Sequence, residues 1–220
     1  MAKTILDSFQ QEILLLFKKT LLVKKFYLGG GTALSEFYLK HRLSEDLDFF
    51  TQEELNLDEL ERFINLAAKK SDAKEIQFQH GFGLYTFFLT GSKGSKHKID
   101  FGQYPFTPIE KLRNLNGMLV ESLYDIAVNK AHTIAFNPRL RDFIDLYFIL
   151  QEEKDWSFDD IFEKSFEKFE MRADALQLGQ NLLQVKTLAD MPVMIKKIEI
   201  EKIKGFFLKE AKKLEEKIWK

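Results

Sequence analysis

Two aspartates separated by a single residue, Asp46 and Asp48, stand in a segment of alternating charged and apolar residues, Asp46-Leu47-Asp48-Phe49-Phe50. This alternation predicts a β-strand in which both carboxylates project from one face. Carboxylates so placed suit hard cations, and Mg²⁺ prefers a few carboxylates together with substrate phosphates. The pair alone is weak evidence for a metal site, because Asp-x-Asp is also frequent in turns and on solvated strand faces.

Three consecutive glycines, Gly29-Gly30-Gly31, lie upstream, between a short predicted strand over 26–28 and a helix for which Thr32 is the predicted N-cap. Backbone N–H groups at such a turn can face a phosphate, and glycine lets the phosphate approach the backbone closely. A tight turn that merely needs positive φ is the alternative explanation for the glycines.

A third carboxylate, Asp100, lies in the predicted strand Lys98-Ile99-Asp100-Phe101. Asp100 shares a strand face with Lys98 and points away from the apolar neighbours. In a two-metal phosphoryl transfer, such a carboxylate helps to hold a cation and assists deprotonation of the attacking hydroxyl. An ordinary exposed strand aspartate is the alternative, and the glycine turn and the Asp-x-Asp pair together favour the chemical interpretation.

The predicted secondary structure that positions these residues changes near residue 105, from mixed helices and strands to helices. Before it we expect helices over 5–22 and 57–69 and a β-rich stretch over 76–101, broken by a flexible turn at 91–95. Beyond it we expect only helices, over 122–135, 140–152, 158–168, 172–188 and 193–219. The predicted fold is therefore α+β, with a mixed-sheet lobe over 1–105 and an all-helical lobe over 106–220.

Composition and net charge limit the kinds of molecule that the chain can be expected to bind. The chain has 220 residues, 45% of them hydrophobic, which suits a folded globule rather than a disordered chain. Its 33 basic and 34 acidic residues give a net charge of −1, so a nucleic acid would have to bind at a local basic patch. Cysteine is absent, which excludes disulfides and thiolate metal sites. We expect neither a signal peptide nor a membrane partner, and a cytoplasmic location.

Longer motifs resemble a known family. The strings Leu28-Gly29-Gly30-Gly31-Thr32-Ala33-Leu34 and His41-Arg42-Leu43-Ser44-Glu45-Asp46-Leu47-Asp48-Phe49-Phe50 resemble the signature of the AbiEii/AbiGii toxin family of nucleotidyltransferases. Two later strings are similar to the family's lysine-containing helix and its Arg-Asp-x-x-Asp helix: Asp125-Ile126-Ala127-Val128-Asn129-Lys130-Ala131 and Arg139-Leu140-Arg141-Asp142-Phe143-Ile144-Asp145-Leu146-Tyr147. The resemblance spans roughly residues 26–150.

This resemblance implies a polymerase-β-like nucleotidyltransferase fold and transfer of a nucleoside monophosphate from an NTP to an acceptor hydroxyl, which in some relatives is a tRNA 3′ end. It also implies a toxin with a cognate antitoxin, and two Mg²⁺ ions for which Mn²⁺ can substitute. The residue roles that it implies are catalysis and metal binding by Asp46, Asp48 and Asp100; nucleotide binding by Gly30, Gly31, Thr32, Arg42 and Lys130; and support from the helical lobe by Arg141, Asp142 and Asp145. The string Phe136-Asn137-Pro138 stands where the family often has a basic residue, which leaves phosphate binding by Arg139 or Arg141 open.

Other interpretations stay open. Arg141 and Asp145 are four residues apart in a predicted helix and can form an ion pair with no role in a site. Lys130 can be a solvated helix lysine. The nine lysines and five glutamates between Lys196 and Lys220 predict a charge-laced, solvated helix rather than a nucleic-acid contact. The whole chain can be a nucleotide- or partner-binding module without turnover, or can transfer the nucleotide to a small molecule of the aminoglycoside type.

Overall fold

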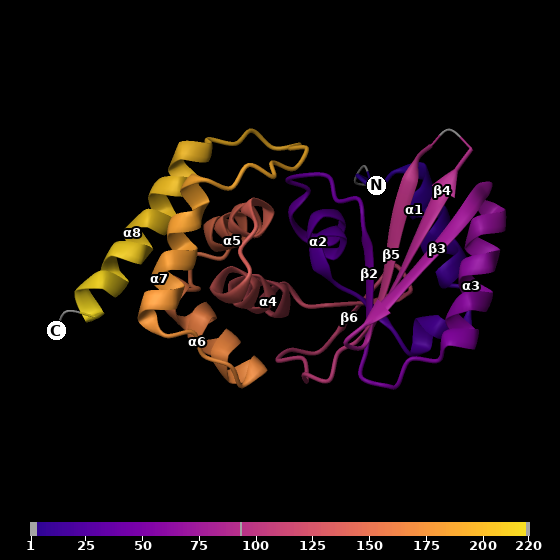
Figure 1. Cartoon of the computed structure of the whole chain (residues 1–220), viewed down its shortest axis with the longest axis horizontal. Coiled ribbons are helices and arrows are strands. Elements are labelled where there is room, and N and C mark those ends of the chain that lie inside the picture. The colour runs from indigo at the N-terminus through magenta and orange to yellow at the C-terminus, as the bar shows by residue number, and fades with distance from the viewer. Residues whose placement is uncertain (1–3, 93, 219–220) are drawn as a thin grey trace. The chain divides into compact units, whose positions relative to one another are not determined.

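The computed structural model describes residues 4–92 and 94–218. The chain divides into two units, Met1–Ser122 and Leu123–Lys220. Figure 1 shows that the strands belong to the first unit and that the second is built from helices. The α+β class expected from the sequence is therefore confirmed.

Within the described residues, the first unit contains a seven-stranded sheet in the order β3-β4-β5-β2-β1-β7-β6. β2 pairs in parallel with β5, and β1 with β7, while the other neighbours are antiparallel. The strand bounds are β1 Tyr27–Leu28, β2 Leu47–Thr51, β3 Ala73–Gly81, β4 Leu84–Gly91, β5 Lys96–Gln103, β6 Arg113–Leu115 and β7 Met118–Val120.

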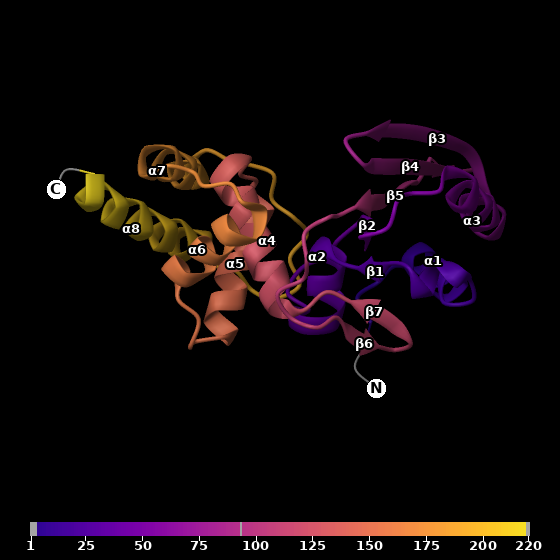
Figure 2. The same cartoon turned by 90° about the horizontal axis from the view of Figure 1, so that it is seen from below.

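Helices lie on both faces of this sheet. α1 (Ser8–Phe17) and α3 (Leu57–Lys70) cover one face, and α2 (Gly30–Ala33), which continues as a π-helical segment over Leu34–Leu39, lies on the other (Figure 2). α1 begins where the sequence provides a capping box: the Asp7 carboxylate accepts a hydrogen bond of 2.7 Å from the Gln10 backbone N–H. The helix predicted over 5–22 is therefore shorter, and a 3₁₀ turn at Leu21–Lys24 follows it.

Side-chain alternation along the central strands divides the core from a polar face. Phe49 of β2 and Phe101 of β5 are fully buried, and their rings stack with centroids 5.3 Å apart. Phe17 of α1 stacks on Phe49 at 4.2 Å, so these odd-numbered residues form the core beneath α1 and α3. Because successive strand residues point to opposite faces, Asp48 and Asp100 project from the other side.

The expectation of helices alone beyond residue 105 was wrong. β6 and β7 form a hairpin around Asn116 and Gly117, whose φ angles are 54° and 77°. An Asn-Gly pair with two positive φ angles suits the primed turns whose twist matches paired strands, so the sequence did contain the signal. The first unit consequently extends to Ser122 instead of ending at the predicted boundary between 105 and 106.

The second unit consists of helices α4 Leu123–Phe136, α5 Leu140–Glu152, α6 Phe158–Phe169, α7 Ala175–Leu183 and α8 Ile200–Ile218. Phe143 of α5 packs edge-on against the fully buried Phe207 of α8, with ring centroids 4.8 Å apart. α7 and α8 are shorter than the helices predicted over 172–188 and 193–219, and Trp219 lies outside the described residues. In the described parts of the chain, no helix is both long enough and apolar enough to cross a bilayer.

Candidate active site

A row of polar side chains crosses three adjacent strands of the sheet. Asp48 of β2 is the register partner of Asp100 on β5, and Asp100 in turn is the partner of Thr86 on β4. Register partners on paired strands project from the same face, so the two predicted catalytic carboxylates lie side by side. The Thr86 hydroxyl donates a hydrogen bond of 2.7 Å to Oδ1 of Asp100, which fixes the orientation of that carboxylate. Asp100 is only 6% exposed, which excludes the ordinary exposed strand aspartate as its explanation.

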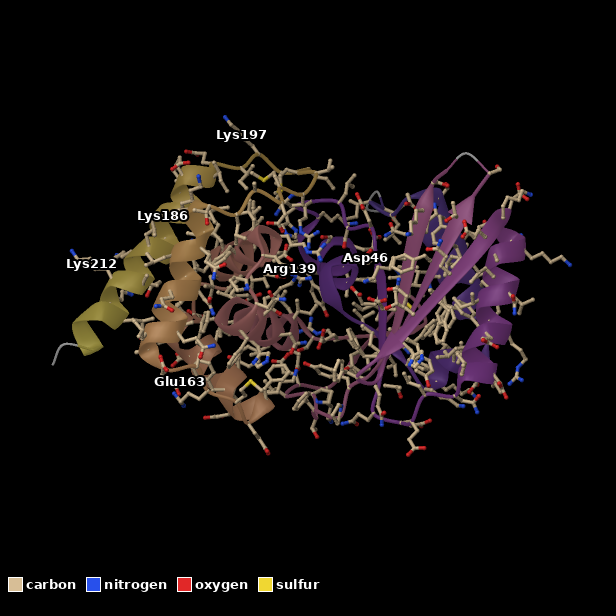
Figure 3. All side chains as sticks on the ribbon, viewed as in Figure 1. Asp46, Arg139, Glu163, Lys186, Lys197 and Lys212 are labelled. Atoms are coloured by element: carbon tan, nitrogen blue, oxygen red, sulfur yellow. The ribbon has the colours of Figure 1, made fainter. Side chains whose placement is uncertain are left out.

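Lys98 stands in the next row, two residues before Asp100 on β5. Its ammonium donates a hydrogen bond to Oδ2 of Asp100 and lies 3.7 Å from Oδ2 of Asp46. Asp46, labelled in Figure 3, immediately precedes β2. Burial opposes the charged ammonium, but the hydrogen bond to Asp100 and the neighbouring carboxylates outweigh burial and raise the pKa of Lys98 above its ordinary value. Lys98 is therefore a protonated, positively charged group beside three carboxylates.

The glycine turn packs directly against these carboxylates. Gly30 has a φ of 64°, and a Cβ at this position would collide with Oδ2 of Asp48. A Cβ on Gly29 would lie 2.8 Å from Oε2 of Glu121. The turn thus needs glycine both for its backbone conformation and for the close approach of side chains, which goes beyond the simple tight turn that the sequence left open.

Thr32 ties the turn to β2, although not as the N-cap that the sequence predicted, and Arg42 lies beside the turn. The helix begins at Gly30 with Gly29 at the N-cap position, so Thr32 lies within α2. Its hydroxyl donates to the backbone carbonyl of Asp46 and ties α2 to the start of β2. Arg42 is 3% exposed, and its Nη2 lies 2.8 Å from the position of a Cβ on Gly31. Nucleotide binding by these residues stays a prediction.

The predicted site residues of the second unit form a cluster of their own. Lys130 of α4 places its ammonium 2.6 Å from Oδ1 of Asp142 and 2.7 Å from Oδ2 of Asp145, both on α5. Both carboxylates are fully buried. The ion pairs connect α4 to α5, and they exclude a simply solvated Lys130. Support of the active site by Asp142 and Asp145 stays a prediction. The predicted role of Lys130 toward the triphosphate stays a prediction as well.

The nearby arginines differ in their surroundings. Arg139, at the N-cap of α5 and labelled in Figure 3, places its Nε 2.7 Å from Oδ2 of Asp142. Arg141 is half-buried on the same helix. Asp145, for which an ion pair with Arg141 was the alternative explanation, lies 2.7 Å from the ammonium of Lys130 on α4.

The residues of the first unit suit a divalent cation by donor chemistry. Asp46, Asp48 and Asp100 supply hard oxygen donors from adjacent backbone segments, and the ammonium of Lys98 contacts two of them, Asp46 and Asp100. As they stand, no three acidic or histidine side chains in the described part of the chain enclose a metal position. Their oxygens are donors of the kind that Mg²⁺ prefers, and a substrate phosphate or water would have to supply the remaining ligands.

Sequence reasoning missed three contributors to this site, namely Lys98, Thr86 and Glu121. The signal for Lys98 was present, since its spacing of two residues from Asp100 places both on one strand face. Thr86 carried no comparable signal, because the pairing of β4 with β5 brings it to Asp100 across 14 residues of sequence. Glu121 was missed with the β6–β7 hairpin, which leads the chain back to the glycine turn.

Comparison with known sequences gives two matches. The sequence model of a family described as "Nucleotidyl transferase AbiEii toxin, Type IV TA system" matches residues 14–220. An uncharacterized protein of Aquifex aeolicus (strain VF5), aq_aa25, is 35% identical over 127 residues, which cover 58% of this chain and 58% of that protein. The match therefore spans little more than half of this relative's length.

Two solved structures share the fold. JHP933 from Helicobacter pylori superposes with a TM-score of 0.59 at 18% identity, covering 95% of this chain and 90% of that one. A proposed nucleotidyltransferase from H. pylori gives a TM-score of 0.60 at 18% identity, covering 95% and 92% of the two chains. At this level of identity, the likeness establishes a common fold.

Proposed function

Since the chain belongs to the AbiEii family of nucleotidyl transferase toxins, we propose that it transfers a nucleoside monophosphate from an NTP to an acceptor hydroxyl and releases pyrophosphate. The observation that carries this proposal is the pairing of Asp48 with Asp100 across two parallel strands, beside the glycine turn. Two carboxylates on one face next to a strand-to-helix turn combine a cation site with a phosphate site.

Asp46, Asp48 and Asp100 are the residues that would hold Mg²⁺, with Mn²⁺ as an alternative. When bound, the cation supplies charge neutralisation for the triphosphate and for the attacking oxygen. Asp100 also accepts the acceptor's proton in this proposal. Thr86 holds Asp100 Oδ1 at 2.7 Å, so the carboxylate keeps a defined orientation toward its neighbours.

The glycine turn would hold the triphosphate. α2 and its π-helical continuation form one helical run that begins at Gly30. The first backbone N–H groups of such a run have no acceptor within the helix, and Gly30 and Gly31 leave room for a phosphate beside them. Thr32 fixes the turn through the Asp46 carbonyl. Arg42, packed against Gly31, adds a positive charge to the same turn.

For the acceptor we propose an RNA hydroxyl, with the 3′ end of a tRNA as the first candidate. The support for this choice is the toxin family, because the net charge of −1 gives none. The same family support makes a cognate antitoxin the expected partner. An NTP-dependent reaction on RNA also implies a cytoplasmic location.

The test is to incubate the purified chain with labelled NTPs, Mg²⁺ and total RNA, and to measure both label transfer and pyrophosphate release. Asp48→Asn and Asp100→Asn should each reduce transfer by at least about 100-fold, because each removes a charge from the reacting centre. Glu61→Gln, which removes an exposed carboxylate on α3, should leave the rate unchanged. Transfer that survives both aspartate substitutions contradicts the proposed centre.

Two further outcomes identify the alternatives. NTP binding without pyrophosphate release over a long incubation supports a binding module that lacks turnover. Transfer to an aminoglycoside but not to RNA supports a small-molecule acceptor at the same carboxylates.

A further inference from the structure

Both oxygens of Asp100 are engaged by groups of the protein itself. Oδ1 accepts the hydrogen bond from Thr86, and Oδ2 accepts from the ammonium of Lys98. The same ammonium lies 3.7 Å from Oδ2 of Asp46. Lys98 therefore stands between two of the carboxylates that the proposed function assigns to the cation.

We propose that Lys98 is a built-in counter-ion that occupies the place of a divalent cation between Asp46 and Asp100, and that it withdraws from them when Mg²⁺ binds. This inference rests on the proposed function, since it concerns the same carboxylates. It adds a residue that sets the cation affinity of the site and keeps the site assembled when no cation is bound.

The carboxylates beside Lys98 repel one another. Asp46, Asp48 and Asp100 bring three carboxylates together on one sheet face, and Asp100 is almost completely buried. Like charges so close to one another raise the free energy of the folded state unless a cation compensates them. Lys98 supplies that positive charge from within the same strand, where its ammonium contacts Asp100 and lies 3.7 Å from Asp46.

The Lys98 ammonium and a divalent cation would use the same carboxylate oxygens. A divalent cation that coordinates Oδ2 of Asp100 and Oδ2 of Asp46 needs the lone pairs that now face the Lys98 ammonium. Two cations at that distance also repel each other. Binding of Mg²⁺ at these two oxygens therefore competes with the present position of Lys98.

The Lys98 side chain can move more easily than that of Asp100. The Lys98 side chain is 31% exposed, whereas that of Asp100 is 8% exposed. A lysine ammonium on a flexible stem with access to solvent can rotate away without a backbone change. Asp100 stays in position meanwhile, because Thr86 holds its other oxygen.

The neighbouring Lys96 provides a matched control. It lies two residues earlier on the same face of β5, is exposed, and places its ammonium 4.3 Å from the centroid of the Phe88 ring. Lys96→Met removes the same charge from the same strand but no contact with Asp46 or Asp100. It therefore measures the general effect of one lost positive charge.

The first experiment is calorimetric titration of the metal-free protein with Mg²⁺. Lys98→Met should bind Mg²⁺ roughly 10- to 100-fold more tightly than the wild type, since it removes a competing cation at contact distance. Lys98→Arg should stay within about threefold of the wild type, and Lys96→Met likewise, because screening weakens a more distant charge. In EDTA, Lys98→Met should melt at a lower temperature than the wild type, and saturating Mg²⁺ should raise its melting temperature by more.

A second experiment needs no variant. Reductive methylation of the wild-type protein, followed by peptide mass spectrometry, measures how accessible each lysine is with and without Mg²⁺. Methylation of Lys98 should increase several-fold when Mg²⁺ is added, because the ammonium leaves its two carboxylates, while methylation of Lys96 should not change. This measurement holds even where Lys98→Met fails to fold.

The outcomes separate this inference from the proposed function. Equal Mg²⁺ affinity in wild type and Lys98→Met, or no rise in Lys98 methylation, overturns the role of Lys98 and leaves a metal-dependent reaction intact. Absence of Mg²⁺ binding in the wild type and in all the variants overturns the metal dependence, and the role of Lys98 with it. Tighter binding by Lys98→Met with unchanged binding by Lys96→Met supports both.

Discussion

Asp100 accepts a hydrogen bond of 2.7 Å from Thr86, the residue directly opposite it on β4. This contact gives the sheet face a rigid carboxylate, because the donor belongs to a strand rather than to a loop. The neighbouring strands thus determine the orientation of a group that the sequence alone presents as one more aspartate.

Replacing Thr86 by valine keeps the shape of the side chain and removes the donor. We expect Thr86→Val to lower nucleotide transfer about tenfold, as is usual when the partner that orients a reactive group is lost. The free energy of unfolding, measured by urea denaturation, should fall by about 1 kcal/mol. Thr90→Val, on the same face of β4, should leave transfer unchanged, and an equal loss in both variants contradicts a specific role for Thr86.

Alanine at Gly30 tests the contact between the glycine turn and the carboxylates. The positive φ and the collision with Asp48 both oppose a Cβ, so Gly30→Ala should lower the free energy of unfolding by at least about 2 kcal/mol. Gly117→Ala is the matched control, because Gly117 has a φ of 77° and a Cβ there would meet no atom within 4 Å. Its cost should be about 1 kcal/mol, from backbone strain alone. Equal losses on urea denaturation argue against the contact with Asp48.

Removal of Lys130 tests the cluster in the helical unit. Lys130→Met deprives two fully buried carboxylates, Asp142 and Asp145, of their shared ammonium and should lower the free energy of unfolding by about 3–5 kcal/mol. Lys164→Met, which removes an exposed ion pair on α6, should produce no measurable change in the same denaturation experiment. A Lys130→Met protein of normal stability whose KM for the NTP is raised would instead support the predicted role toward the triphosphate.

Burial lowers the pKa of His132 from 6.5 to about 4. The ring stacks on Phe169 with centroids 3.8 Å apart, which accounts for the loss of solvent around it. Because the folded protein holds this histidine neutral while the unfolded chain protonates it below about pH 6.5, stability is complete above that pH and falls as the pH drops toward 4.

The loss attributable to His132 should be about 1–2 kcal/mol between pH 7 and pH 4, allowing for solvent screening of a partly exposed ring. Urea denaturation at a series of pH values measures it. His132→Phe should flatten the pH dependence between pH 6.5 and 4. His80→Gln, on the exposed strand β3, controls for the loss of an imidazole elsewhere, and an unchanged slope in His132→Phe contradicts the assignment.

The spacing of apolar and polar residues within each element predicted much of this fold. It did not predict the contacts between strands of the sheet. α5 begins and ends where the periodicity of its apolar residues predicted, at Leu140 and Glu152. The alternation around Asp48 and Asp100 likewise predicted that both carboxylates leave the core. Both features depend on how apolar residues repeat within a single helix or strand, and that repeat can be read from one sequence.

The failures have a common physical origin in long-range pairing. Thr32 was predicted as an N-cap from its type, but α2 begins at Gly30, and the Thr32 hydroxyl binds the Asp46 carbonyl instead. The position of Lys98 between Asp46 and Asp100 depends on β2 lying next to β5, and nothing in the local pattern specifies that strand order. Tertiary pairing therefore decided the partners of residues whose own elements were predicted correctly.

The alternation on β5 also limits how this gene can vary. Lys98 and Asp100 serve the polar face, while Ile99 and Phe101 fill the core, so each residue of the strand is committed to one side. Insertion or deletion of a single codon within β5 would turn two charged groups into the hydrophobic interior and two apolar ones into solvent. Loss of the reactive face and loss of the fold would then come from the same mutation, so this strand can change by substitution but not by length.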